Sequence, residues 1–136
     1  MELVSPTPTN NTYLSANTFI VNVTHTEIHP DRIVFYLSGN SPQISAYSGS
    51  STAFTTPALS DGVYTYYVWV NDTAGNTNQT ETRTITIDTT PPTTTPTAVD
   101  NTGSNYNFNT WTGSTYVNVT LSCDDGSGSG LSLIHI

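Results

Sequence analysis

Two histidines four residues apart are the first side chains in this sequence that could bind a metal. They lie in the segment His25-Thr26-Glu27-Ile28-His29. On a helix this spacing puts both imidazoles on one face, where they can share a zinc ion. Here Pro30 follows directly, the context is the end of a strand, and the glutamate is misplaced for a zinc metalloprotease motif. We therefore predict no zinc site.

Carboxylates are the second group that could bind a metal. The aspartates fall mostly in predicted turns and linkers: Asp61, Asp72, Asp88, Asp100, Asp124 and Asp125. Calcium sites need such oxygens in a spaced loop like that of the EF-hand, and no such loop is present. We predict no cofactor, and keep calcium at Asp88 and Asp100 as the alternative. No Ser/His/Asp arrangement favours nucleophilic catalysis, so we predict that the chain is not an enzyme.

Five asparagines match the acceptor pattern for N-glycosylation, Asn-x-Ser/Thr. They are Asn10, Asn22, Asn71, Asn78 and Asn118. A chain this rich in Asn and Thr produces some matches by chance. Asn22 and Asn118 both lie at polar positions of alternating segments, so a glycan there would leave a core undisturbed.

Aromatic residues cluster in the run DGVYTYYVWVND, residues 61–72. The Asp61-Gly62 turn before Tyr64 resembles a tyrosine corner, in which the phenol hydroxyl bonds to nearby backbone. Alternation then places Tyr64 and Tyr66 toward the core and Tyr67 and Trp69 outward. The outward pair could stack on a sugar ring or anchor a partner. The alternative is that neighbouring strands or a glycan cover both rings.

Composition excludes several classes of function. Among 136 residues there are 2 basic and 10 acidic ones, with a formal charge of -8. Nucleic-acid binding needs clustered cations, so we predict none. No apolar window is long enough to span a membrane, and the first residues do not resemble a signal peptide. The single Cys123 cannot form an intramolecular disulfide.

Alternating apolar residues indicate the elements that position these side chains. Segments of this kind, separated by turn residues, cover 2–4, 18–24, 32–37, 43–47, 52–55, 61–72 and 83–88. Nothing has a helical period. About seven short strands in about 90 residues predict an all-β chain with an immunoglobulin-like antiparallel sandwich over residues 1–88.

A repeat indicates that a second module begins further along. Residues 89–97 are rich in Pro and Thr and predict a semi-rigid linker. After it, Val21-Asn22-Val23-Thr24 recurs as Val117-Asn118-Val119-Thr120, 96 positions later. We expect residues 98–130 to be the truncated start of a similar module. Coincidence is the alternative, because the match is only four residues long.

The first 97 residues resemble the immunoglobulin-like and fibronectin type III-like modules of archaeal and bacterial surface proteins. The resemblance lies in Ser5-Pro6-Thr7, Leu59-Ser60-Asp61-Gly62-Val63-Tyr64, Val70-Asn71-Asp72-Thr73-Ala74-Gly75-Asn76 and Thr86-Ile87-Asp88-Thr89-Thr90-Pro91-Pro92. It implies stalk or adhesive units without catalytic residues. The segment 123–130 is similar to modules in which a cysteine pairs with another further along.

Together these observations predict a structural or adhesive module of a repetitive, glycosylated surface-layer or adhesin-type protein outside the cell. Its partners would be neighbouring modules, glycans or cell-surface proteins. The alternatives are a carbohydrate-binding module that uses Tyr67 and Trp69, and an accessory domain of a secreted hydrolase. The apolar residues 131–136 follow a Gly/Ser run abruptly, and we interpret them as a translated sequencing adapter.

Overall fold

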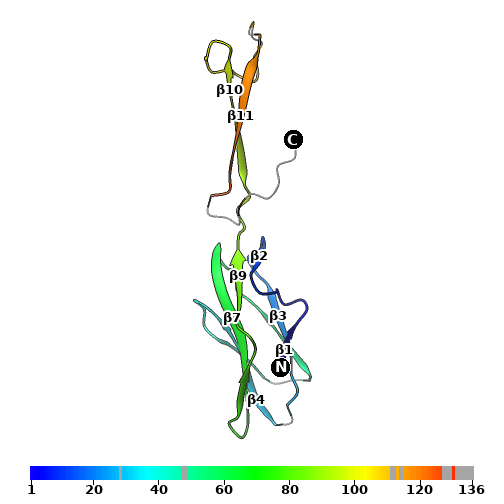
Figure 1. Ribbon diagram of the computed structural model, residues 1–136. Helices are drawn as coiled ribbons and strands as arrows, with labels where there is room; N and C mark the ends of the chain where they lie inside the picture. The colour runs from blue at the N-terminus through cyan, green and yellow to red at the C-terminus, as the bar shows by residue number, and fades with distance from the viewer. Residues whose placement is uncertain (28, 47–48, 111–112, 114, 127–129, 131–136) are drawn as a thin grey trace. The chain divides into compact units, whose positions relative to one another are not determined.

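The chain folds into two units, which we describe from a computed structural model (Figure 1). The structure describes residues 1–27, 29–46, 49–110, 113, 115–126 and 130. Unit 1 comprises Met1–Thr89 and unit 2 comprises Thr90–Ile136. The interpretation of residues 131–136 as an adapter sequence falls outside the described residues.

Every described element is a β-strand. In unit 1 these are β1 (Glu2–Val4), β2 (Thr12–Leu14), β3 (Ile20–Thr24), β4 (Pro30–Leu37), β5 (Gln43–Ala46), β6 (Ser51–Thr55), β7 (Gly62–Asp72), β8 (Thr77–Gln79) and β9 (Arg83–Ile87). Unit 2 contains β10 (Thr93–Asp100) and β11 (Val117–Asp124). The all-β fold class predicted from alternation is confirmed, and each predicted segment of residues 1–88 contains a strand.

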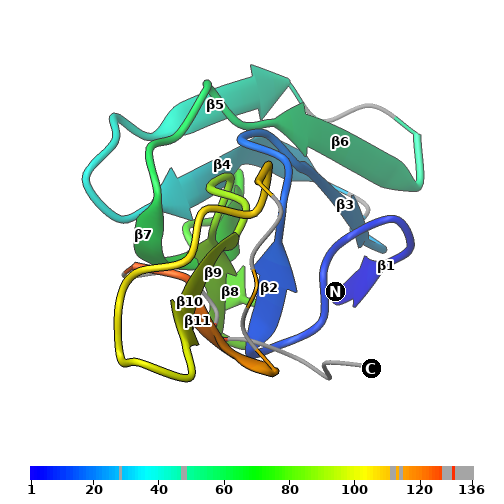
Figure 2. The same ribbon diagram turned by 90° about the horizontal axis from the view of Figure 1, so that it is seen from above.

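Unit 1 is a sandwich of two sheets, seen from above in Figure 2. One sheet has the order β1-β3-β6. The other has the order β2-β9-β7-β4-β5, with β8 added to the far end of β7. The long strand β7 therefore lies in the middle of the larger sheet, between β9 and β4.

The core lies between these sheets because each strand turns alternate apolar residues inward. Val21 and Val23 of β3 are fully buried, as are Tyr66 and Val68 of β7. Aromatic rings join the layers, since Phe35 of β4 stacks on Phe54 of β6 with 5.5 Å between ring centroids. The faces predicted for Tyr66 and its neighbours in the strand are therefore correct.

Two short strands were missed by the sequence analysis. Strand β2 pairs in parallel with β9. The sandwich therefore contains one parallel pairing, whereas the sequence predicted an antiparallel sandwich. Strand β8 pairs with the end of β7 after a turn in which Gly75 has φ +89°, a conformation that favours glycine. Each has only three residues, and neither Thr-Tyr-Leu nor Thr-Asn-Gln alternates between apolar and polar side chains.

Unit 2 contains a two-stranded antiparallel sheet, in which β10 pairs with β11 from Thr93↔Asp124 to Asp100↔Val117. Strand β10 begins inside the stretch predicted as a linker, residues 89–97. That boundary was wrong from Thr93 onward, because residues 93–97 are paired along β11 and do not form a free connection.

The position of Pro96 explains how a proline-containing stretch joins a sheet. Backbone groups at even positions of β10 make hydrogen bonds to residues other than those of β11. Ala98 O accepts from Tyr106 N at 2.9 Å, and Asp100 N donates to Ser104 O at 2.9 Å. By alternation the nitrogen of Pro96 faces the same edge, away from β11. Its missing N–H therefore costs no bond to the partner strand.

Candidate functional site

Tyr64 makes the hydrogen bond that the corner motif predicts. Its hydroxyl donates to the carbonyl oxygen of Ser60 at 3.0 Å, and its ring packs against the core cluster of unit 1. Asp61 completes this turn, since its Oδ1 accepts from both the N–H and the hydroxyl of Thr89. The bond of Tyr64 closes the turn before β7, and the bonds of Asp61 hold this turn beside the end of β9.

Tyr67 and Trp69 lie on the outward face of the larger sheet, opposite the buried Tyr66 and Val68. Both are only half-exposed. The ring of Tyr67 stacks on that of Tyr36, with centroids 4.8 Å apart and planes 17° apart. One face of Tyr67 is therefore already covered, and its other face is the side that could meet a ligand.

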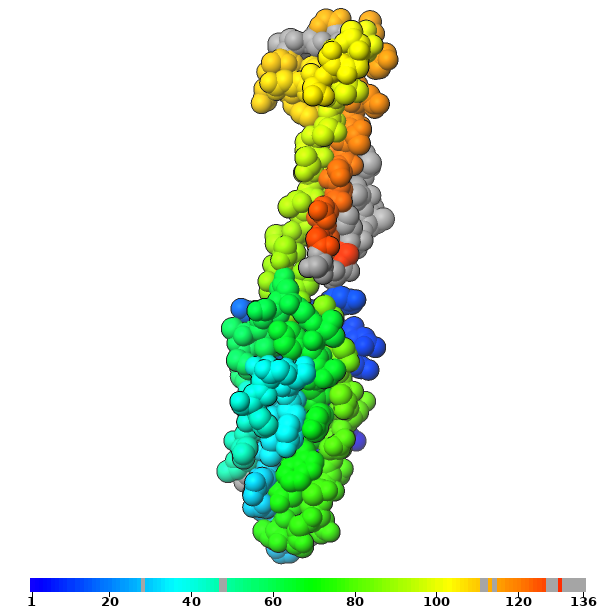
Figure 3. All heavy atoms as spheres, turned by 90° about the vertical axis from the view of Figure 1, so that its left-hand side faces the viewer, coloured from blue at the N-terminus to red at the C-terminus, as the bar shows by residue number. Residues whose placement is uncertain are grey.

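The structure adds three neighbours that the sequence analysis did not connect to these rings. These neighbours are Tyr36, Val34 and Ile44. Val34 lies opposite Trp69, and Ile44 lies opposite Val34. Trp69, Val34 and Ile44 therefore form one row across β7, β4 and β5. Val34 is 4% exposed although it points away from the core, whereas Ile44 is 67% exposed. We call Val34, Tyr36, Ile44, Tyr67 and Trp69 the outer cluster. Its residues belong to β4, β5 and β7, the segments coloured cyan to green in Figure 3.

Three of the five sequons present an accessible asparagine. Asn10, Asn78 and Asn118 are exposed. The side-chain oxygens of Asn10 and Asn78 accept backbone N–H groups, from Thr84 at 2.7 Å and from Gln79 at 2.8 Å. Their amide nitrogens, which would carry a glycan, make no bond to other described residues.

The other two sequons have engaged amides. Asn22 is half-buried, and its Nδ2 donates to Ser5 O at 3.3 Å. Asn71 donates from Nδ2 to Asp31 Oδ2 at 2.7 Å, and its Oδ1 is buried without a hydrogen-bond partner among the described residues. The bond from Asn71 also holds the pKa of Asp31 below its usual value. A glycan on Asn71 would break this contact.

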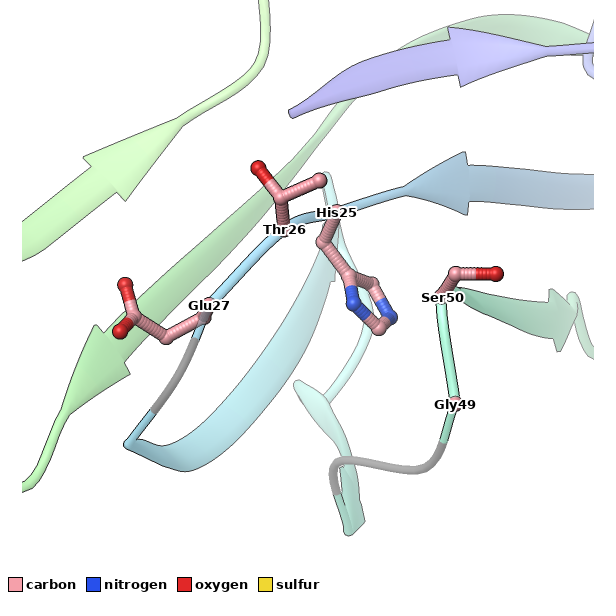
Figure 4. A pocket seen from close by; sticks show the side chains of 5 residues that line it. All are labelled: His25, Thr26, Glu27, Gly49 and Ser50. Atoms are coloured by element: carbon pink, nitrogen blue, oxygen red, sulfur yellow. The ribbon is translucent and has the colours of Figure 1, made fainter.

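His25 lines a pocket of about 570 Å³ together with Thr26, Glu27, Gly49 and Ser50 (Figure 4). The imidazole points toward the segment of Gly49 and Ser50, whereas Glu27 points away from it. His25 is 4% exposed, and its Nε2 lies 3.0 Å from the hydroxyl of Thr52. Burial lowers the pKa of His25, because the charged imidazolium would lose its hydration.

The two histidines of the 25–29 segment differ in burial, since His25 is buried and His29 is exposed. His29 is exposed, and its backbone N–H donates to Glu27 Oε1 at 3.1 Å. Within the described part of the chain, no three His, Cys, Asp or Glu side chains are grouped so that they could hold a metal ion.

The alternative calcium ligands lie in different units, Asp88 in unit 1 and Asp100 in unit 2. Asp100 Oδ1 accepts from the N–H and the hydroxyl of Thr102 and from the N–H of Ser104. These contacts give Asp100 a structural role, which is to shape the turn after β10.

Nothing in the described residues forms a helix able to span a membrane. No curated protein and no solved structure matches the chain significantly. A family model does match residues 8–89, which include every strand of unit 1 except β1. Its description is a bacterial Ig-like domain, as the two-sheet sandwich and the tyrosine corner lead one to expect. By this match over more than half of its length, the chain belongs to the bacterial Ig-like domain family.

Proposed function

We propose that the chain is a structural module of a repetitive, glycosylated surface protein, in which sandwich units space and project other parts. The observation that carries the proposal is the sandwich of unit 1, a domain type that is commonly a non-catalytic part of surface proteins. The recurrence of Val-Asn-Val-Thr in β3 and β11 supports the repetition.

Accessible sequons support the expectation of glycosylation. Asn10, Asn78 and Asn118 are exposed, and a glycan at any of them leaves the buried cluster untouched. Asn71 is the poorest acceptor, because its amide is bonded to Asp31 and partly buried. We expect glycan occupancy to be highest at Asn78 and Asn118 and lowest at Asn71. Site-resolved mass spectrometry of the native protein would measure this order.

Surface exposure can be tested on intact cells that produce the protein. Antibodies raised against residues 1–89 should label cells without permeabilisation, and external protease should remove the label. A cytoplasmic protein serves as the control, and it should stay unlabelled until the cells are permeabilised. Labelling of the chain only after permeabilisation would contradict the proposed function.

Carbohydrate recognition by Tyr67 and Trp69 is the second candidate, favoured by one observation. The outer cluster brings five apolar or aromatic side chains together on a face that is not the core face. A glycan array should then bind the chain and lose binding with Trp69→Ala. The matched control is Tyr13→Ala, which removes an aromatic ring that is 60% exposed outside the cluster.

A further inference from the structure

Among the described residues, one edge of the β10–β11 sheet has no paired strand. In the part of the chain that the structure describes, β11 pairs with β10 alone. The backbone N–H and C=O groups at even positions of β10 point away from β11, so those at odd positions point toward it. The odd positions of β10 lie opposite the even positions of β11, and the backbone groups of these even positions therefore point toward β10. By the same alternation, the N–H and C=O groups of Val117, Val119 and Leu121 face the open edge.

Unit 1 contains the same four residues with both edges occupied. On one side, β3 pairs with β1, and Leu3 lies opposite Val23. This pairing corresponds to that of β11 with β10, in which Ala98 lies opposite Val119. On the other side, β3 pairs with β6, with Val21 opposite Phe54. Position by position, Val21 and Val23 of β3 correspond to Val117 and Val119 of β11.

The backbone groups of the two valines point toward β6 in unit 1, and those of the matching valines point toward the open edge in unit 2. Just beyond the ends of β3, His25 N donates to Ser50 O at 3.0 Å, and Thr56 N donates to Phe19 O at 3.1 Å. Odd positions of β3 therefore bond to the β6 side. Val117 and Val119 are the matching odd positions of β11, so their N–H and C=O groups point where a β6-type strand would lie.

The side chains of the β10–β11 sheet are divided between an apolar and a polar face. Its register places Pro96, Ala98, Val117, Val119, Leu121 and Cys123 on one face, with Thr94 and Asp100 at the two ends of that face. The other face carries mainly Thr, Ser and Asn. Val119 is 50% and Leu121 52% exposed, whereas Val21 and Val23 of β3 are fully buried. The middle of this face, from Val117 to Leu121 on β11, thus has the composition of a core face.

We propose that the open edge of β11 is an acceptor site for one added antiparallel strand of the β6 type. The partner is an extended peptide segment without charge, with an aromatic residue opposite Val117 and a small polar residue opposite Val119. Strand addition of this kind takes affinity from main-chain hydrogen bonds and specificity from alternate side chains. The proposal concerns unit 2 and is independent of the surface role.

Charge supports this choice of partner. No charged residue lies between Val117 and Ser122 of β11, and none lies in β6, Ser51–Thr55. Pairing these strands therefore desolvates no ion. With a formal charge of -8, the chain repels acidic peptides in general, so an uncharged strand is the better occupant.

The test adds a synthetic peptide of residues 49–57, Gly-Ser-Ser-Thr-Ala-Phe-Thr-Thr-Pro, to the full chain at up to about 1 mM and follows amide hydrogen exchange. We expect exchange at Val117, Val119 and Leu121 to slow by about tenfold or more. The matched control peptide exchanges the order of Ala and Phe, which moves the ring to the polar face without changing composition. It should give little protection.

A chain variant tests the same edge from the other side. Val119→Pro removes an outward N–H and should abolish peptide protection while β10 stays paired, as Pro96 is tolerated at an outward position of β10. Val119→Thr keeps the N–H and should retain protection. Two results with peptide would overturn the proposal: no slowing of exchange at these amides, or equal slowing by both peptides. A third would be protection of Val117, Val119 and Leu121 in the chain alone that rises with chain concentration. That result would indicate that a second copy of the chain occupies the edge.

Discussion

At the scale of the residue, Tyr64 is fixed by one hydrogen bond to backbone. Tyr64→Phe removes the hydroxyl that donates to Ser60 O and leaves the ring in place. Because this turn is partly open to water, we expect a loss of about 0.5–1.5 kcal/mol in the free energy of unfolding. Chemical denaturation would measure it. Tyr13→Phe is the control, since Tyr13 is exposed, and an equal loss in both variants would refute the structural role of the corner.

His25 gives unit 1 a dependence on pH. Burial lowers the pKa of His25 in the folded state, so the unfolded chain binds a proton more readily. Stability is then fully present above the unfolded pKa of about 6.5 and is lost as pH falls below it. We expect the melting temperature to fall between about pH 7.5 and pH 5.

The control for this dependence is the neighbouring histidine. His25→Gln should flatten the pH profile over that interval, because the group that must be charged on acidification is gone. His29→Gln should leave the profile unchanged, because His29 is exposed. A profile that keeps its slope without His25 would show that another group is responsible.

At the scale of the element, β7 has two faces of unequal energetic weight. Tyr66 is fully buried and donates from its hydroxyl to Pro8 O at 2.7 Å, so Tyr66→Ala should cost about 3–5 kcal/mol. Tyr67→Ala and Trp69→Ala remove half-exposed rings and should cost about 1–2 kcal/mol each. Urea titrations of the three variants would rank them. Equal losses would contradict the assignment of faces.

Alternation also explains why the outer cluster is harder to foresee than the core. The period of two places Tyr67 and Trp69 outward but does not specify which strand lies beside them. Strand pairing brings Tyr36 and Val34 next to these rings, and both come from β4, more than 30 positions earlier. Pairing of this kind depends on long-range packing that no local pattern contains.

At the scale of the whole molecule, the two units should differ in stability. The buried cluster of unit 1 lies entirely within Met1–Thr89, so a chain of residues 1–92 should melt at the same temperature as the full chain. A two-stranded sheet is marginal in water, so the amides of β11 should exchange much faster than those of β3. Calorimetry and amide exchange would check both expectations. A clearly lower melting temperature for residues 1–92 would contradict them.

The sequence by itself determined the all-β class, the seven longer or flanking strands of unit 1 that it predicted, and the faces of β7. Alternating apolar residues define a strand face locally, and the Asp-Gly turn before Tyr64 is likewise a local pattern. The parallel pairing of β2 and the inclusion of Thr93 to Thr97 in a strand were not foreseeable in this way. Both depend on a partner strand that is distant in the sequence.

The segment Val-Asn-Val-Thr makes the distinction clearest, because it occurs twice. In β3 its two valines are fully buried, whereas in β11 Val119 is half exposed. Local sequence is the same in both places, so it predicts a strand with one apolar face in both. Whether that face is covered depends on the opposing sheet, which unit 1 supplies through β4, β7 and β9. Burial is a property of the assembled sheets, so only the tertiary structure decided it.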